Sequence, residues 1–135
     1  MDLRQIMTVS GSGMAVQSAR MKVLSENIAN SESVDGDNGE AYRRQVISFQ
    51  TITDRATGLK TVKVKEVSPD YNTPMRQIFD PSHPAADDKG FVTMPNVSTV
   101  IESTDLREAS RAYEANINVI ENTKNMMSRS LDLLR

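Results

Sequence analysis

The sequence predicts an α+β protein in which two long helices at the ends of the chain flank a small β-rich insert. Apolar residues recur every seven positions near both ends, as they do along helices that pack on other helices. All five prolines and several short runs of alternating β-branched residues lie between these ends. The predicted domains are an N-terminal helix over residues 1–30, an extended β-rich insert over 31–95 and a C-terminal helix over 96–135.

The N-terminal helix carries a narrow apolar seam. One heptad position is apolar throughout and comprises Met7, Met14, Met21 and Ile28. The second seam position is mixed and comprises Leu3, Ser10, Gln17 and Leu24. Gly11 and Gly13 each cost a helix about 1 kcal/mol relative to alanine. We expect the helix to continue through them, and a break at this point is the alternative.

The stretch SENIANSES, residues 25–33, places two asparagines where the apolar seam ends. Asn30 follows the last apolar seam residue, and asparagine suits the C-terminus of a helix. Asn27 directly precedes Ile28 and flanks the seam. We therefore predict that Asn30 ends the helix and that Asn27 hydrogen-bonds to a neighbouring helix.

The C-terminal segment has no glycine or proline after Pro95, so residues 97–133 can form one helix about 55 Å long. Asn96 or Ser98 is suited to cap its N-terminus. Two rows with a period of seven make one broad apolar face of Leu106, Tyr113, Ile117, Ile120, Met127, Leu131 and Leu134. The two amphipathic ends predict an intramolecular helical hairpin, which must close over about 65 residues, or a coiled-coil dimer.

The insert is predicted to be extended, polar and rich in turns. Residues 33–40 and residues 56–59 have typical turn sequences, SVDGDNGE and ATGL. Strands are predicted over residues 42–49, 60–67 and 75–79, and residues 91–97 are predicted to be extended. In the second of these strands lysines alternate with valines, which suits a half-exposed strand with a protected edge.

No pattern in the insert points to catalysis or metal binding. His83, the only histidine, lies near Asp80, Asp87 and Asp88, but the spacing matches no zinc site. We therefore interpret residues 80–90 as a rigid, irregular connector. No nucleophile elbow, P-loop or dinucleotide motif occurs, so we expect no enzyme, no catalytic residue, no cofactor and no metal.

Two adjacent arginines are the remaining candidates for ligand binding. Arg43 and Arg44, beside Tyr42, have the charge to contact a phosphate. A solvated strand face is the interpretation that we favour, because exposed charged residues on strands are common.

Composition restricts the class of protein further. Apolar residues make up 38% of the chain and aromatic residues only 4%, which is thin for a self-sufficient core, so we expect an elongated protein whose apolar surface is partly completed by neighbours. A net charge of −2 with both signs scattered argues against a nucleic-acid partner. The absence of cysteine excludes disulfides and thiol catalysis. No stretch approaches the roughly 20 apolar residues of a membrane span, and we expect no cleavable secretory signal.

Three stretches together resemble one protein family, the flagellar basal-body rod proteins, and within it most closely the proximal rod members. They are SGSGMAVQSARMKVLSENIANSES (10–33), FDPSHPAADDKGFVTMPNV (79–97) and SRAYEANINVIENTKNMMSRSLDLL (110–134), about half of the chain. The Ser-x-Asn-aliphatic-Ala-Asn run at residues 25–30 is similar to the signature of the rod family. The runs DPSHPAAD, GFV, MPNV and RAYEANI resemble the proximal rod members more specifically.

The resemblance implies a structural subunit that polymerises into the rod, the drive shaft that transmits motor torque. It implies terminal helices that pair as an antiparallel coiled coil and pack on neighbouring subunits. Implied partners are copies of the chain, other rod proteins, a rod-to-ring adaptor, the membrane-ring protein and the flagellar type III export apparatus. The implied location is the periplasmic rod of the basal body. The alternative is an autonomous coiled-coil adaptor with a small β module.

The predicted subunit interface combines seam residues of both helices with polar residues beside them. Its members are Met7, Met14, Gln17, Met21, Leu24, Asn27, Ile28, Asn30, Leu106, Tyr113, Asn116, Ile117, Ile120, Met127 and Leu131.

Overall fold

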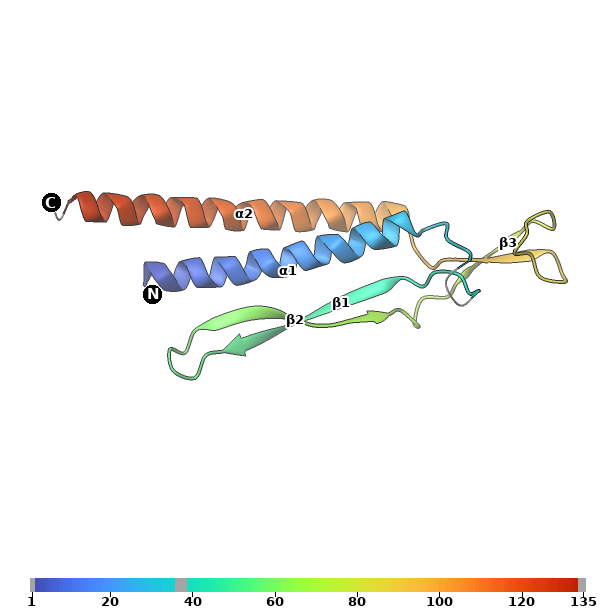
Figure 1. Cartoon of the computed structure of the whole chain (residues 1–135), viewed down its shortest axis with the longest axis horizontal. Helices are drawn as coiled ribbons and strands as arrows, with labels where there is room; N and C mark the ends of the chain where they lie inside the picture. Colours follow the sequence, from blue (N-terminus) through green and yellow to red (C-terminus); the bar gives the residue numbers. More distant parts are fainter. Residues whose placement is uncertain (1, 36–38, 134–135) are drawn as a thin grey trace. The chain divides into compact units, whose positions relative to one another are not determined.

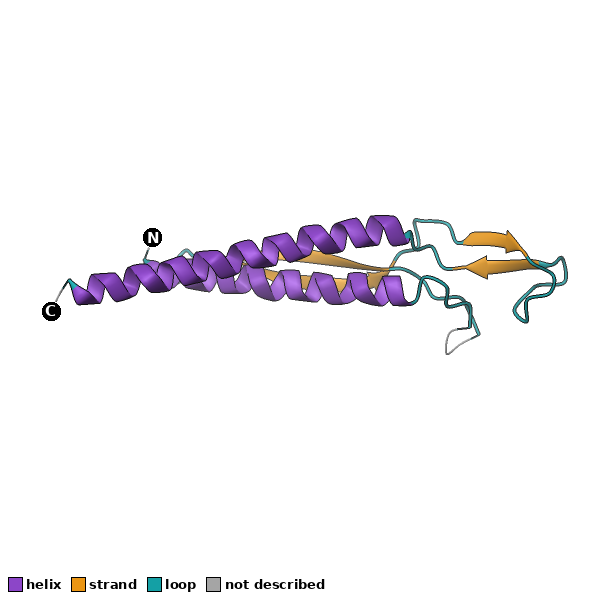
Figure 2. Cartoon of the chain, turned by 90° about the horizontal axis from the view of Figure 1, so that it is seen from above, coloured by secondary structure: helices purple, strands orange, loops and turns teal. Residues whose placement is uncertain are grey.

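The computed structural model describes residues 2–35 and 39–133 and confirms the predicted α+β class (Figure 1). Two long helices stand at the two ends of the sequence, and short antiparallel strands lie between them in sequence (Figure 2). In chain order the elements are α1 (Leu3–Ala29), β1 (Gln45–Thr53), β2 (Lys60–Pro69), β3 (Arg76–Phe79), β4 (Phe91–Met94) and α2 (Thr99–Asp132). Leu134 and the centre of the predicted turn at residues 36–38 lie outside the described residues.

Helix α1 is continuous through both of its glycines, as expected. Its first turn is closed by a reciprocal pair of hydrogen bonds. The Asp2 N–H donates to Gln5 Oε1 at 3.0 Å, and the Gln5 N–H donates to the Asp2 carbonyl at 2.9 Å. These bonds satisfy backbone groups that the start of a helix otherwise leaves unpaired.

The chain divides into two compact units. The first comprises Met1–Met21, Ile47–Glu66 and Arg107–Arg135, and the second comprises Lys22–Val46 and Val67–Leu106. Both helices and both strands of the β1–β2 hairpin contribute residues to both units.

In the first unit the helices run antiparallel in close contact. Gly13 of α1 lies against Asn116 of α2, and Arg20 Nη1 lies 3.9 Å from Glu108 Oε1. Because the residue number rises along one helix as it falls along the other, the pairing is antiparallel. Strand β2 joins this pair through the Val62 N–H, which donates to Ser12 Oγ at 3.3 Å.

The most buried side chains of α2 are spaced by seven residues, but they are not the predicted apolar face. This row consists of Glu102, Ala109 and Thr123, and Asn116 occupies its remaining position. The predicted face is half-buried from Leu106 to Met127, and Leu131 is exposed. Small and polar side chains therefore form the close contact between the helices, and the larger apolar side chains flank it.

In the second unit β3 and β4 form a two-stranded antiparallel ladder, in which Ile78 pairs with Val92 and Phe79 with Phe91. The turn that precedes β4 needs glycine, because Gly90 has a φ of +83° and a Cβ there would lie 3.0 Å from the Phe79 ring.

The strand predictions are confirmed over residues 60–67, all of which lie in β2, and over residues 75–79, of which β3 covers all but Met75. The predicted turn at 56–59 is confirmed as well, with Gly58 at a φ of +69°. The first strand was placed too early in the sequence, because β1 begins at Gln45 and runs to Thr53. Tyr42 and Arg44 instead hydrogen-bond to Asn27 at the end of α1 and to Glu102 at the start of α2, respectively.

The two glycines of α1 predict a measurable contrast. Gly11→Ala should raise the free energy of unfolding by about 0.5–1 kcal/mol, because alanine favours the helix. A methyl group there meets no atom within 4 Å. Gly13→Ala should raise the free energy of unfolding by less than Gly11→Ala does, or lower it, because its Cβ would lie 3.1 Å from Asn116 Nδ2. Urea denaturation measures both, and Asn116→Ala in the Gly13→Ala background should recover the difference. Equal stabilisation by the two alanines would contradict the close helix contact.

Candidate functional site: a buried polar cluster and the predicted subunit interface

Asn27, in the last turn of α1, is completely buried and has its whole hydrogen-bonding capacity filled inside the chain. Its Nδ2 donates to the Gln45 carbonyl at 2.9 Å and to Glu102 Oε2 at 3.0 Å. Its Oδ1 accepts from the Gln45 N–H at 2.9 Å and from the Tyr42 hydroxyl at 2.8 Å. A primary amide has two donors and two acceptor lone pairs, so none is left over.

An asparagine is required here because its side chain acts as a peptide group. The amide exchanges two hydrogen bonds with the backbone of Gln45, the first residue of β1, as a neighbouring strand would. A carboxylate at this position could accept hydrogen bonds but not donate them, and an aliphatic side chain could neither donate nor accept. Asn27 therefore fixes the start of β1 on the end of α1.

Glu102, in the first turn of α2, is only 1% exposed, yet both of its oxygens are bound. Asn27 donates to Oε2, and Arg44 Nε donates to Oε1 in an ion pair. The N-terminal position also favours the negative charge through the helix dipole. Arg44 Nη1 lies 3.3 Å from Asp70 Oδ2, so one guanidinium bridges two carboxylates. Pairing of this kind is what allows charges to be buried.

Asp70 and Asn96 complete the arrangement. The hydroxyl and the backbone N–H of Thr73 lower the pKa of Asp70 to about 2, so this carboxylate is charged at neutral pH. Asn96 accepts the Arg44 N–H at 2.8 Å and donates to the carbonyls of Asp70 and Thr73 at 3.1 and 3.0 Å.

Tyr42 provides a neutral donor to this arrangement. Burial raises the pKa of its hydroxyl, and the nearby charges of Glu26 and Glu102 raise it further. The hydroxyl therefore remains protonated and donates to Asn27.

We call Asn27, Tyr42, Arg44, Asp70, Asn96 and Glu102 the polar cluster. Its charges are paired and its hydrogen bonds join its members to one another. It can therefore hold the end of α1, the start of β1 and the start of α2 together, and it offers no reactive group to a substrate.

The structure corrects the interpretation of the two arginines as a solvated strand face. Arg44 belongs to the polar cluster, and both residues precede β1. Arg43 lies 4.8 Å from the centre of the Tyr71 ring and donates to the Asp70 carbonyl. Asn96, proposed as a helix cap, belongs to the polar cluster, and it is the Ser98 carbonyl that accepts the Glu102 N–H at the start of α2.

The second asparagine of the SENIANSES stretch stands where predicted. Helix α1 ends at Ala29, and Asn30 Nδ2 donates back to the Glu26 carbonyl at 2.8 Å, while its Oδ1 accepts from Ser33 Oγ. No non-glycine residue of the described chain has a positive φ. Asn30 therefore caps the helix through its side chain and not through a left-handed backbone.

The acidic connector is held by its own turns. Asp80 Oδ1 accepts the hydroxyl and the N–H of Ser82, and Asp87 Oδ1 accepts the N–H groups of Lys89 and Phe91. His83 Nδ1 accepts the Ala85 N–H at 3.1 Å. Within residues 2–35 and 39–133 no three ligating side chains gather as a metal site would require. No helix in this part of the chain is long and apolar enough to cross a membrane.

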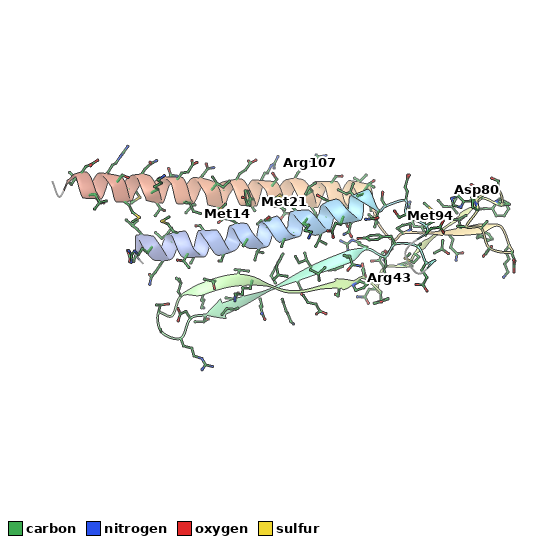
Figure 3. All side chains as sticks on the ribbon, in the orientation of Figure 1. Met14, Met21, Arg43, Asp80, Met94 and Arg107 are labelled. Atoms are coloured by element: carbon green, nitrogen blue, oxygen red, sulfur yellow. The ribbon has the colours of Figure 1, made fainter. Side chains whose placement is uncertain are left out.

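The predicted interface residues differ in their exposure. Leu24 and Asn27 are buried. Leu131 is 65% exposed. The half-buried members on α1, two of which are labelled in Figure 3, are Met7, Met14, Gln17, Met21 and Ile28, followed by Asn30 just after the helix. The half-buried members on α2 are Leu106, Tyr113, Asn116, Ile117, Ile120 and Met127. Their contact with other subunits stays a prediction.

Comparison with known proteins decides the family. A protein from Agrobacterium fabrum described as flagellar basal-body rod protein FlgC is 42% identical over 128 residues, which cover 94% of this chain and 91% of the relative. Proteins with the same description from Salmonella typhimurium and Escherichia coli O6:H1 are 40% and 38% identical, each over 98% of both chains. The chain belongs to the FlgC family of flagellar basal-body rod proteins.

Two family models match the two ends of this FlgC-family chain. The model of the flagella basal body rod protein matches residues 7–36, which include most of α1. The model of the flagellar basal body rod FlgEFG protein C-terminal matches residues 88–133, which include β4 and α2. The resemblance seen in the sequence is thereby confirmed, and both matched regions contribute residues to the polar cluster.

Most of the polar cluster was missed from the sequence. Tyr42 and Arg44 were noticed only as a charged run, and Asp70 and Glu102 were not noticed at all. A usable signal was present in Glu102, because a carboxylate in the first turn of a helix is favoured by the helix dipole.

We expect Asn27→Leu to lower the free energy of unfolding of the monomer by about 2–4 kcal/mol. It leaves the Gln45 backbone and the buried Glu102 without partners. Asn30→Leu, three residues further on, should cost less than about 1 kcal/mol, because this residue lies at an exposed helix end. Urea denaturation followed by circular dichroism compares the two. An unchanged midpoint for Asn27→Leu would show that the residue is not structural.

Asp70 predicts a pH dependence of stability. Its folded pKa of about 2 lies below the usual 3.8, so its contribution is present above pH ~4 and is lost as the pH falls toward 2. Asp70→Asn should therefore be less stable than the native chain at pH 7, and the gap should close on acidification. Thr73→Val, which removes the main donor, should shift the loss to higher pH. Denaturation at a series of pH values measures this, and a gap that stays constant from pH 7 to pH 2 would contradict the assignment.

Proposed function

We propose that the chain is a structural subunit of the flagellar basal-body rod and acts by polymerising with its own copies and with other rod proteins. The observation that carries this proposal is the exposed apolar end of α2. Met126 is 57% exposed, Leu131 65% and Leu133 87%. Large apolar side chains gathered on one helix end are unfavourable in water and typical of a surface that another protein covers.

The pairing of the helices explains why this end is uncovered. With Gly13 opposite Asn116 in an antiparallel pair, Leu3 at the start of α1 falls opposite Met126. The last turns of α2 therefore extend beyond the first residue of α1, as Figure 1 shows for the C-terminal end of that helix. Nothing in the described part of the first unit covers Leu131 or Leu133.

The predicted interface fits a helix pair packed among further helices. Its members on α1 and α2 are half-buried or exposed in the isolated chain, apart from Leu24 and Asn27. We propose that the half-buried and exposed members are covered by neighbouring subunits. Asn27 is the exception, because all of its hydrogen bonds are used within the chain.

The further partners follow from family membership and are part of the proposal. They are the rod-to-ring adaptor, the membrane-ring protein and the flagellar type III export apparatus. The rod so formed lies in the periplasm and transmits motor torque. We propose a structural role for the chain and not an enzymatic one. The side chains of the polar cluster support a structural role, because they are paired with one another.

Replacing the exposed apolar residues tests the proposal. The double variant Leu131→Asp, Leu133→Asp should abolish motility and rod formation in cells without another copy of the gene. The unfolding free energy of the monomer should change by less than about 0.5 kcal/mol, because both side chains are exposed. Electron microscopy of basal bodies measures the first effect and urea denaturation the second.

A matched control uses two exposed polar positions of the same helix. Asn125→Asp with Ser128→Asp adds the same charge at two exposed polar positions and should leave the rod intact. Normal rods with the double leucine variant would contradict polymerisation through α2. A discrete soluble dimer that the leucine variant dissociates would support the coiled-coil adaptor instead.

A further inference from the structure

The second unit contains a cavity of about 310 Å³ with an apolar floor and an acidic rim. The apolar side chains that line it are Val34, Ile78, Val92 and Met94, and the polar ones are Glu32, Asp80 and His83. Asp80 and Met94, labelled in Figure 3, stand at the end of β3 and the end of β4. Ile78, which pairs with Val92 in the ladder, remains 45% exposed.

The acidic rim is charged, and no lysine or arginine is among the described residues that line the cavity. The hydroxyl and the N–H of Ser82 lower the pKa of Asp80, so it is ionised at neutral pH. Glu32 is exposed, and no described residue pairs with its carboxylate. An apolar floor beside carboxylates fits a lysine, whose aliphatic stem packs on apolar surface while its ammonium group binds the charge.

The first unit carries the complementary charge on its β1–β2 hairpin. Lys63 and Lys65 alternate with valines along β2, so both project from one face, and both are exposed. Neither forms an ion pair with any residue that the structure describes. Lys65 stands next to Glu66, whereas Lys63 stands between two valines, so Lys63 has the less compensated charge.

We propose that the cavity of one copy binds Lys63 from the β1–β2 hairpin of a second copy. This contact rests on the proposed function, because it needs copies packed side by side. The proposed contact is heterologous, so that it repeats from copy to copy, as a polymer requires. A contact of the cavity with the same cavity of a second copy would place Glu32 and Asp80 against the partner's carboxylates, which is unfavourable.

Cross-linking tests the pairing directly, because the chain contains no cysteine. Cells that lack their own copy of the gene would express Glu32→Cys and Lys63→Cys chains together, and purified basal bodies would be treated with a short bismaleimide. The hetero cross-link should exceed either symmetrical cross-link about tenfold. Glu40→Cys paired with Lys63→Cys is the control and should give background, because Glu40 is an exposed acid of the same unit that does not line the cavity.

A charge exchange provides a second readout. Glu32→Lys and Lys63→Glu should each lower motility, and the chain that carries both should recover it, because each contact then has its charges inverted. Glu40→Lys should have no effect. No rescue, together with background cross-linking, would overturn the contact.

The remaining outcomes separate this contact from the proposed function. If the leucine variants of α2 block the rod while Glu32 and Lys63 do not couple, the hairpin contact is wrong and the rod subunit stands. If the leucine variants leave the rod normal, the proposed function itself fails. A cross-link within one chain in dilute monomer carrying both cysteines, or a cross-link of Lys63→Cys only to another rod protein, would overturn the pairing between copies.

Discussion

The second unit depends on the hydrogen bond between Asn27 and Glu102, which joins the end of α1 to the start of α2 across 75 residues of sequence. The carboxylate it binds is 1% exposed and is stable there only because Arg44 pairs with its other oxygen. Arg44 in turn needs Asp70, and Asp70 needs Thr73. Removing one partner of a buried ion pair typically lowers the free energy of unfolding by about 3–5 kcal/mol, because the other charge stays buried without compensation.

Because of this dependence, the polar cluster fixes the register of α1 against β1 and α2 in the second unit. Apolar seams tolerate small shifts, whereas an amide that exchanges two hydrogen bonds with one backbone residue does not. The buried apolar side chains are few and mostly small, for example Val16, Val92 and Ala109. Polar geometry therefore supplies the precision that a larger core would otherwise supply.

The sequence predicted the elements that depend on hydrophobic periodicity and on local turn and cap chemistry. Both helices, the strands near residues 60–67 and 75–79, the turn at Gly58 and the helix end at Asn30 follow from patterns within a few residues. The buried row of α2 escaped notice because its members, such as Ala109 and Thr123, are small or polar and leave no mark on a hydrophobic pattern. The polar cluster escaped because its partners are far apart in sequence, and nothing local distinguishes a solvated arginine from Arg44.

A chain with a small core and exposed apolar helix ends is most stable when neighbours cover it. Any partner that binds the folded form and not the unfolded one adds to the free energy of unfolding in proportion to the logarithm of its concentration over its Kd. Leu131 and Leu133 would contribute little in the monomer and much in an assembly, because their area leaves water only there. In the proposed assembly, buried polar hydrogen bonds fix the second unit of each copy, and apolar contacts between copies would stabilise the polymer.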